Sequence, residues 1–114
     1  MLKLFKKKPY FIIKLNEDAG VPPIPVYQKK IIIGRGVNHV LSIPDNSISR
    51  NHVEVEYKDG AILITDLATS NGTKIDGEPI PVSLPVHYQP FQVLVLGQSK
   101  VSIQFELLDN KQKQ

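Results

Sequence analysis

Short stretches of β-branched and aromatic residues, separated by glycine, proline and Asp-Gly pairs, restrict the fold of this chain most. Residues 53–57 alternate strictly, with Val53, Val55 and Tyr57 on one side and glutamates on the other. Asp59-Gly60 follows as a hairpin turn signal, and apolar residues resume at 61–67. No segment repeats apolar residues at the helical spacing of 3.6. Many short strands with frequent turns predict an all-β, antiparallel sandwich or barrel.

The same residue pattern predicts the other strands and two irregular segments. Strands are predicted at 10–15, 29–34, 40–43, 52–58, 61–67, 73–75, 91–97 and 100–108. Residues 20–28 hold three prolines and therefore suit neither a helix nor a central strand. Residues 79–90 hold four prolines, so an irregular connection is expected there. Asp76-Gly77 is a second turn signal.

The 114 residues suffice for one domain, which we place at residues 10–108, between a basic N-terminal tail (1–9) and a polar C-terminal tail (109–114). The net charge of +3 reflects these tails, because six of the fourteen Lys and Arg residues lie in them. The eight basic residues outside the tails are outnumbered by the eleven acidic residues of the chain. A nucleic-acid-binding domain carries a basic face within its fold, so nucleic acid is an unlikely partner.

Cysteine is absent, which excludes disulfides and cysteine-based zinc sites. No apolar run approaches the roughly 20 residues that cross a bilayer, and the first residues lack the apolar core of a secretory signal. We therefore expect an intracellular, cytoplasmic protein without a membrane span. His39, His52 and His87 show no metal-ligand spacing, and no cofactor is implied.

Three predicted loops carry most of the polar chemistry. They are Gly34-Arg35-Gly36 after one strand, residues 47–52 before the next, and residues 69–73 between two more. Twelve of the fourteen basic residues are lysines, yet both arginines, Arg35 and Arg50, lie in these loops. Arginine presents a planar fork of donors that matches carboxylate or phosphate. Guanidinium, hydroxyl and amide groups together favour a phosphate ligand.

Catalysis is the weaker interpretation of the same residues. Ser49 and His52 are close in sequence, and Asp66 is available as a third group. No Gly-x-Ser-x-Gly elbow surrounds the serine, however, and neighbours along a loop-to-strand junction need not share the geometry of a catalytic triad. We expect a protein that is not an enzyme.

Three motifs in this order resemble the forkhead-associated (FHA) family. They are "GRG" at 34–36, "SISRNHV" at 47–53 and "TDLATSNGTKIDG" at 65–77. The motif match covers residues 33–77, and the strand pattern extends it over most of 10–107. The resemblance implies a phosphothreonine-binding antiparallel β-sandwich with its ligand loops at one end. One departure is Asp76-Gly77, where the family usually has Asn-Gly; aspartate also tolerates turn geometry.

The resemblance also implies a role for each matching residue. Arg35 grips the phosphate, the hydroxyl and backbone of Ser49 donate to it, and Ser70 helps to bind it. Arg50 occupies a position that often contacts the phosphate or the peptide, and Asn71 holds the peptide backbone. The residues that shape or brace the loops are Gly34, His52, Gly72 and Thr73.

These roles imply a non-catalytic module that recognises phosphothreonine segments of a partner protein in kinase-dependent signalling or assembly. The partner is then a Ser/Thr kinase or a kinase substrate. Family specificity usually depends on the third residue after the phosphothreonine, and the candidate readers are Ser47, Gly97 and Gln98. These carry no charge, which favours an apolar or neutral peptide residue. The alternative is an FHA-like sandwich that binds its partner through another face, without phosphate.

Overall fold

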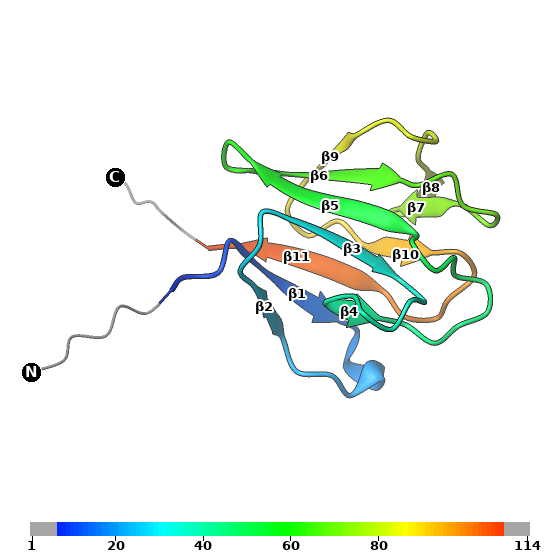
Figure 1. The fold of residues 1–114 in the computed structure, drawn as a ribbon, viewed down its shortest axis with the longest axis horizontal. Coiled ribbons are helices and arrows are strands. Elements are labelled where there is room, and N and C mark those ends of the chain that lie inside the picture. Colours follow the sequence, from blue (N-terminus) through cyan, green and yellow to red (C-terminus); the bar gives the residue numbers. More distant parts are fainter. Residues whose placement is uncertain (1–6, 109–114) are drawn as a thin grey trace, which may run out of the picture.

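Residues 7–108 are described by the computed structural model, and they form two β-sheets and one short 3-10 helix (Figure 1). The predicted tail residues 1–6 and 109–114 lie outside the described part of the chain. The first sheet contains β1 (Phe11–Leu15), β2 (Ile24–Val26), β7 (Thr73–Ile75), β8 (Glu78–Pro79), β10 (Leu94–Leu96) and β11 (Ile103–Leu107). The second contains β3 (Lys30–Gly34), β4 (Leu41–Ser42), β5 (Val53–Lys58), β6 (Ala61–Asp66) and β9 (Val86–Tyr88). The 3-10 helix η1 spans Glu17–Ala19.

The two sheets pack face to face as a β-sandwich, as predicted. Their strand orders are β2-β1-β11-β10-β7-β8 and β4-β3-β5-β6-β9. Alternate residues of each strand point into the space between the sheets, as Val53 and Val55 of β5 do. Tyr57, predicted on the same face, is partly buried against this core. The aromatic rings of Phe11 and Tyr88 both pack edge-on against Phe105.

The two predicted Asp-Gly turns are confirmed, and so is the prediction that residues 20–28 form neither a helix nor a central strand. Asp59 and Gly60 both adopt positive φ, and so do Asp76 and Gly77, as a two-residue type I′ turn requires. In the segment 20–28, only residues 24–26 form a strand, and this strand, β2, lies at the edge of its sheet. A proline there removes no hydrogen bond from the interior of the sheet.

Three predictions need correction. The irregular connection expected at 79–90 contains β9, which pairs with β6 at the sheet edge between Pro85 and Pro90. The strand expected at 91–97 is shorter, because Phe91 lies in a turn and only Leu94–Leu96 pair with β7. Not every strand pair is antiparallel, because β3 and β4 run parallel. A six-residue connection can join them because β4 is only two residues long.

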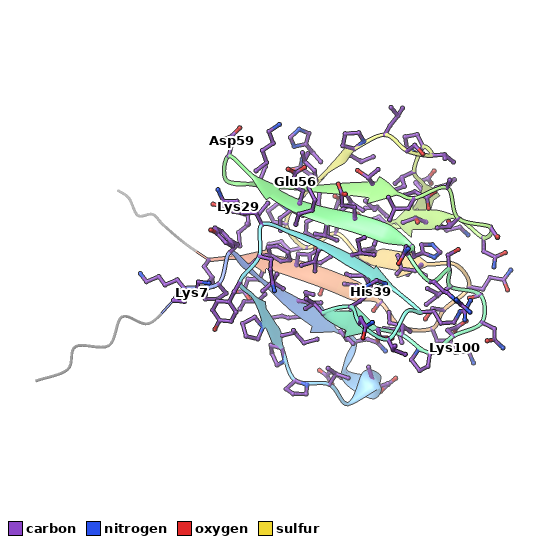
Figure 2. All side chains as sticks on the ribbon, in the orientation of Figure 1. Lys7, Lys29, His39, Glu56, Asp59 and Lys100 are labelled. Carbon is purple, nitrogen blue, oxygen red and sulfur yellow. The ribbon has the colours of Figure 1, made fainter. Side chains whose placement is uncertain are left out.

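Four loops emerge at the same end of the sandwich (Figure 1). They follow β3, β4, β6 and β10. Figure 2 shows Lys100 at this end, whereas Lys7, Lys29 and Asp59 lie at the opposite end. Within residues 7–108, no helix is long and apolar enough to cross a membrane.

Candidate functional site at the loop end of the sandwich

The candidate site is built from four segments at this end. We call residues 35–40 the first loop, 43–52 the second loop, 67–72 the third loop and 97–102 the last turn. All three motifs predicted from the sequence lie in or beside these segments. Hydrogen bonds between the segments determine which side chains meet.

The first and second loops touch at Gly34. A Cβ atom at this position would lie 2.2 Å from the backbone oxygen of Arg50, so only glycine allows this approach. The contact continues as two backbone bonds, from Arg35 N to Ser49 O (2.9 Å) and from Gly36 N to Arg50 O (3.1 Å). His39 Nε2 donates to the same Arg50 oxygen at 2.9 Å. The two loops are therefore held together through their main chains.

Arg35 is positioned by its own side chain as well. Its Nε–H donates to the backbone oxygen of Ile48 at 2.9 Å, and the side chain is partly buried. This bond uses one donor and leaves the two terminal nitrogens of the guanidinium for a ligand. Among residues 7–108, the one ion pair joins Lys14 to Glu106, so no described carboxylate neutralises Arg35. A fixed, unneutralised guanidinium suits an anion.

His52 joins the second and third loops from inside the fold, where its side chain is fully buried. Its Nδ1 accepts the N–H of Ser49 at 3.0 Å, and its Nε2 lies 2.7 Å from the carbonyl oxygen of Gly72. A carbonyl only accepts, so Nε2 carries the proton and the ring is neutral. Both nitrogens are thus used in holding the loops, which leaves neither free to act as a catalytic base.

Asp66, at the end of β6, organises the third loop. Its carboxylate accepts the hydroxyls of Thr73 (2.6 Å) and Thr69 (2.7 Å), and Thr69 in turn accepts the N–H of Gly72 (3.1 Å). Burial alone would raise the pKa of Asp66, but these hydrogen bonds outweigh it and hold that pKa below its ordinary value. The sequence interpretation considered Asp66 only as a possible catalytic group. The Asp-x-x-Thr spacing at 66–69 was the local signal for this role.

Ser47 links the second loop to both remaining segments. Its backbone oxygen accepts from Asn71 Nδ2 at 2.8 Å, and its hydroxyl accepts from Gln98 N at 2.9 Å. A Cβ at Gly97 would lie 2.4 Å from the Ser47 oxygen, so the last turn approaches as closely as glycine permits. The three residues named as specificity candidates therefore lie together.

The single donor of the Ser47 hydroxyl is also used, because it donates to Asp45 Oδ1 at 2.7 Å. Hydrogen bonds from the hydroxyl and the backbone N–H of Ser47 hold the pKa of Asp45 below its ordinary value. The carboxylate of Asp45 is therefore ionised at neutral pH. It adds a negative charge on the side of the site where Ser47 and Gln98 meet.

The remaining predicted residues lie in the second and third loops. Ser49 is partly buried, and its backbone N–H is already donated to His52, so its hydroxyl is the group left for a ligand. The side chains of Arg50, Ser70 and Asn71 are exposed. Within residues 7–108, no three His, Asp or Glu side chains gather in a way that could hold a metal ion.

A two-sheet sandwich that presents a fixed arginine and several hydroxyls from loops at one end belongs to the class of rigid β-scaffolds whose functional residues are carried on loops. Comparison with known proteins identifies the family within this class. The model of the FHA domain matches residues 31–97, more than half of the chain, and the chain belongs to the FHA domain family.

Curated proteins are also similar to part of this chain. Zeaxanthin epoxidase from Prunus armeniaca, a chloroplastic protein, is 30% identical over 73 residues, which cover 60% of this chain and 11% of that protein. The chain spans about a tenth of the length of the curated relatives it matches.

Two solved structures share the fold. The FHA domain of FhaA, a Mycobacterium tuberculosis protein, was solved in complex with the intracellular domain of Rv3910. It is 25% identical, with a TM-score of 0.71 over 84% of this chain and 99% of that one. The N-terminal FHA domain of S. cerevisiae Rad53p, in complex with a phosphothreonine peptide, has a TM-score of 0.77 at 14% identity over 88% and 94% of the two chains.

Proposed function

We propose that this domain is a non-catalytic module that binds phosphothreonine segments of a partner protein. The observation that carries the proposal is Arg35, fixed through Nε to Ile48 and without a carboxylate partner among the described residues. A phosphothreonine brings about −1.5 to −2 charges and three acceptor oxygens. The terminal nitrogens of Arg35 and the hydroxyls of Ser49 and Ser70 are the complementary donors.

Asn71 is the proposed contact to the peptide backbone. One N–H of its amide is held by the Ser47 oxygen, which sets the orientation of the side chain. The amide oxygen and the second N–H then remain for a peptide group. Arg50 contributes its exposed side chain as a second positive charge.

On the Asn71 side of the site, Gln98 is the proposed reader of a peptide side chain. Gly97 has no side chain, and the hydroxyl of Ser47 is already used by Gln98 and Asp45. The ionised Asp45 repels an acidic residue, so this proposal favours a neutral or apolar one. The proposed partner is a threonine-phosphorylated protein, either a kinase or its substrate. The same proposal includes a cytoplasmic location, where ATP is available to phosphorylate the partner.

Calorimetry with a degenerate phosphothreonine peptide library and its unphosphorylated twin tests the proposal. We expect measurable affinity for the phosphorylated library only. Equal affinity for both would overturn the proposal and favour the phosphate-independent alternative.

One surface favours that alternative specifically. Phe91 is 87% exposed beside a cavity of about 400 Å³ that Tyr88, Phe105 and Leu107 also line. The turn that carries Phe91 precedes β10, whereas the last turn follows it, so this surface lies away from the loop end. A partner that binds equally with and without phosphate would be sought here.

A further inference from the structure

A groove runs along β3 and reaches the first loop. It has a volume of about 360 Å³ and is lined on the strand side by Gln28, Lys30, Ile31 and Ile32 and by Glu54 of β5, and on the loop side by residues 38–40. His39, which lines it, is the residue whose Nε2 donates to the Arg50 oxygen. The groove is therefore continuous with the second loop of the candidate phosphate site.

The strand beside this groove has an open edge. β5 pairs with β3 from Lys30 to Ile33, whereas β4 pairs with the other side of β3 only at Ile33 and Gly34. Within residues 7–108, the other edge of β3 from Lys30 to Ile32 thus has no strand beside it. An extended chain is the natural partner of such an edge, since the main-chain groups there need hydrogen bonds.

Along the chain, Val37 stands between Arg35 and the groove-lining residues 38–40, and its side chain is 86% exposed. The loop that carries it is braced on both sides, by the bonds from Gly36 and His39 to the Arg50 oxygen and by Ser42 Oγ, which donates to the Arg35 oxygen at 3.3 Å. These bonds hold the residues on either side of Val37, whose apolar side chain is left exposed to water. Val40, further along the same loop, is 38% exposed and lines the groove.

The first and third loops contact the second loop through different residues. The first loop bonds to the second loop through Arg35, Gly36 and His39. The third loop bonds to the second through Asn71 and through the Gly72 oxygen. The second loop therefore contacts both, with Val37 carried by the first loop and Asn71 by the third.

We propose that one flank of the phosphopeptide crosses Val37 and enters the groove along β3. It places an apolar side chain against Val37 and Val40 and runs extended beside Lys30–Ile32. The occupant is the peptide itself, because the groove continues from the site that holds the phosphothreonine. This inference rests on the proposed function and adds a requirement for an apolar residue on one side of the phosphothreonine.

Four phosphopeptides with a common core test the inference. Two carry apolar extensions, one on the N-terminal and one on the C-terminal side, a third carries polar extensions on both sides, and the fourth is the short core alone. Calorimetry compares the wild type, the isosteric variant Val37→Thr and the matched control Val82→Thr. Val82 is also exposed, but it lies beside Asp66, on the side of the third loop.

We expect one apolar extension to bind about fivefold more tightly than the polar one, as burial of one or two methylene groups predicts. Val37→Thr should remove this gain and leave affinity for the short core unchanged within about twofold, whereas Val82→Thr should keep the gain. Amide shifts at Ile32 and Asn38 that appear only with the extended peptide would place the flank in the groove.

Binding of the short core with no gain from either apolar extension would overturn this inference and leave the proposed function intact. So would a gain that survives Val37→Thr, or a gain without shifts along β3. Absence of binding by any phosphopeptide, the short core included, would instead overturn the proposed function on which the inference rests.

Discussion

His52 Nε2 lies 2.7 Å from the carbonyl oxygen of Gly72, and this bond ties the second loop to the third beneath the candidate site. The other ring nitrogen accepts the N–H of Ser49. Both groups bonded to the buried ring would lose their partners if the ring were removed. His52, which the sequence offered as a candidate catalytic group, therefore supports the loops.

His52→Ala is expected to lower the free energy of unfolding by about 2–4 kcal/mol, because two polar backbone groups lose their partner and a cavity remains. Urea denaturation measures the change. His87→Ala is the matched control, since His87 is exposed on the edge strand β9 and should change stability by less than about 0.5 kcal/mol. A His52→Ala protein as stable as the wild type would contradict the supporting role.

Arg35→Lys should fold normally and lose at least about tenfold in affinity for a phosphothreonine peptide. A lysine ammonium cannot donate to the Ile48 oxygen and also present a planar fork to the phosphate. Arg35→Ala should bind the phosphorylated and unphosphorylated peptides equally. Calorimetry of both variants, with thermal unfolding to verify the fold, makes the measurement.

Lys100→Ala is the control for Arg35, since Lys100 is an exposed cation at the same end of the sandwich (Figure 2). It should lower affinity only slightly, and high salt should remove the difference. Normal phosphopeptide binding by Arg35→Ala would show that the phosphate contact was assigned to the wrong residue.

Gly34→Ala tests the close approach of the first two loops. The added methyl would meet backbone atoms of Arg50 and Ser49 at 2.2–2.7 Å, so the loops must separate. We expect a loss of more than about 2 kcal/mol in unfolding free energy. Gly60→Ala is the control, because nothing lies within 4 Å there and only its positive φ opposes the change, at a cost of about 1 kcal/mol. Equal losses in the two variants would argue against the loop contact.

Asp66→Asn is expected to lower stability at neutral pH by about 1–3 kcal/mol, because a neutral amide oxygen accepts the two threonine hydroxyls less strongly than a carboxylate, and an amide nitrogen cannot accept the Thr69 N–H that bonds to Oδ2. The folded pKa of Asp66 lies below its ordinary value of 3.8. Its ionised form therefore adds stability that is fully present above that value and is lost as the pH falls through the folded pKa.

Urea denaturation of the wild type and Asp66→Asn from about pH 7 to pH 2 measures this contribution. The stability difference between the two proteins should be constant at neutral pH and shrink below about pH 4. Asp59→Asn, in an exposed turn where asparagine also adopts positive φ, should show no such change. A difference that stays constant down to the lowest pH would contradict the role of the Asp66 charge.

Phe91→Asn is expected to raise the free energy of unfolding by about 0.5–1 kcal/mol. Gln92 N donates to Gln89 O at 3.1 Å, and Pro90 precedes Phe91, whose φ is 72°, so residues 89–92 form a type II turn. The third position of that turn favours glycine or asparagine. Because the Phe91 ring is exposed, its burial offsets little of the backbone strain that its positive φ causes.

Thermal unfolding measures the effect of Phe91→Asn, and Phe91→Leu is the control. Leucine keeps an apolar side chain with the same backbone strain, so it should leave stability nearly unchanged. A loss of stability in Phe91→Asn would show that the ring packs usefully within the monomer.

Much of the fold followed from local pattern. Val53 and Val55 face the core because successive side chains in a strand point to opposite sides, which is a property of the backbone itself. Asp59-Gly60 turns the chain because both residues accept positive φ. The edge strand β9 was missed because the prolines around Val86–Tyr88 concealed a three-residue strand.

The site was less accessible to sequence reasoning. The motifs located Arg35 and Ser49 correctly in loops at one end, yet the role of Asp66 in forming the third loop was not foreseen. The engagement of the Ser47 hydroxyl was also hidden, since its partner Gln98 lies 51 residues away in the chain. A polar side chain in a loop has several available partners, and its sequence neighbours do not select among them.

By itself, the sequence determined the strand faces, the tight turns and the set of donors available at the loops, because each depends on residues a few positions apart. Tertiary structure decided which loops touch. The arrangement of β3, β4 and β5 in the second sheet brings the Arg50 oxygen against Gly34, and the third loop, which joins the two sheets, brings Asn71 to Ser47 and Gly72 to His52. Those contacts turn a collection of polar loop residues into one site, because they leave Arg35 fixed in place with its terminal donors free.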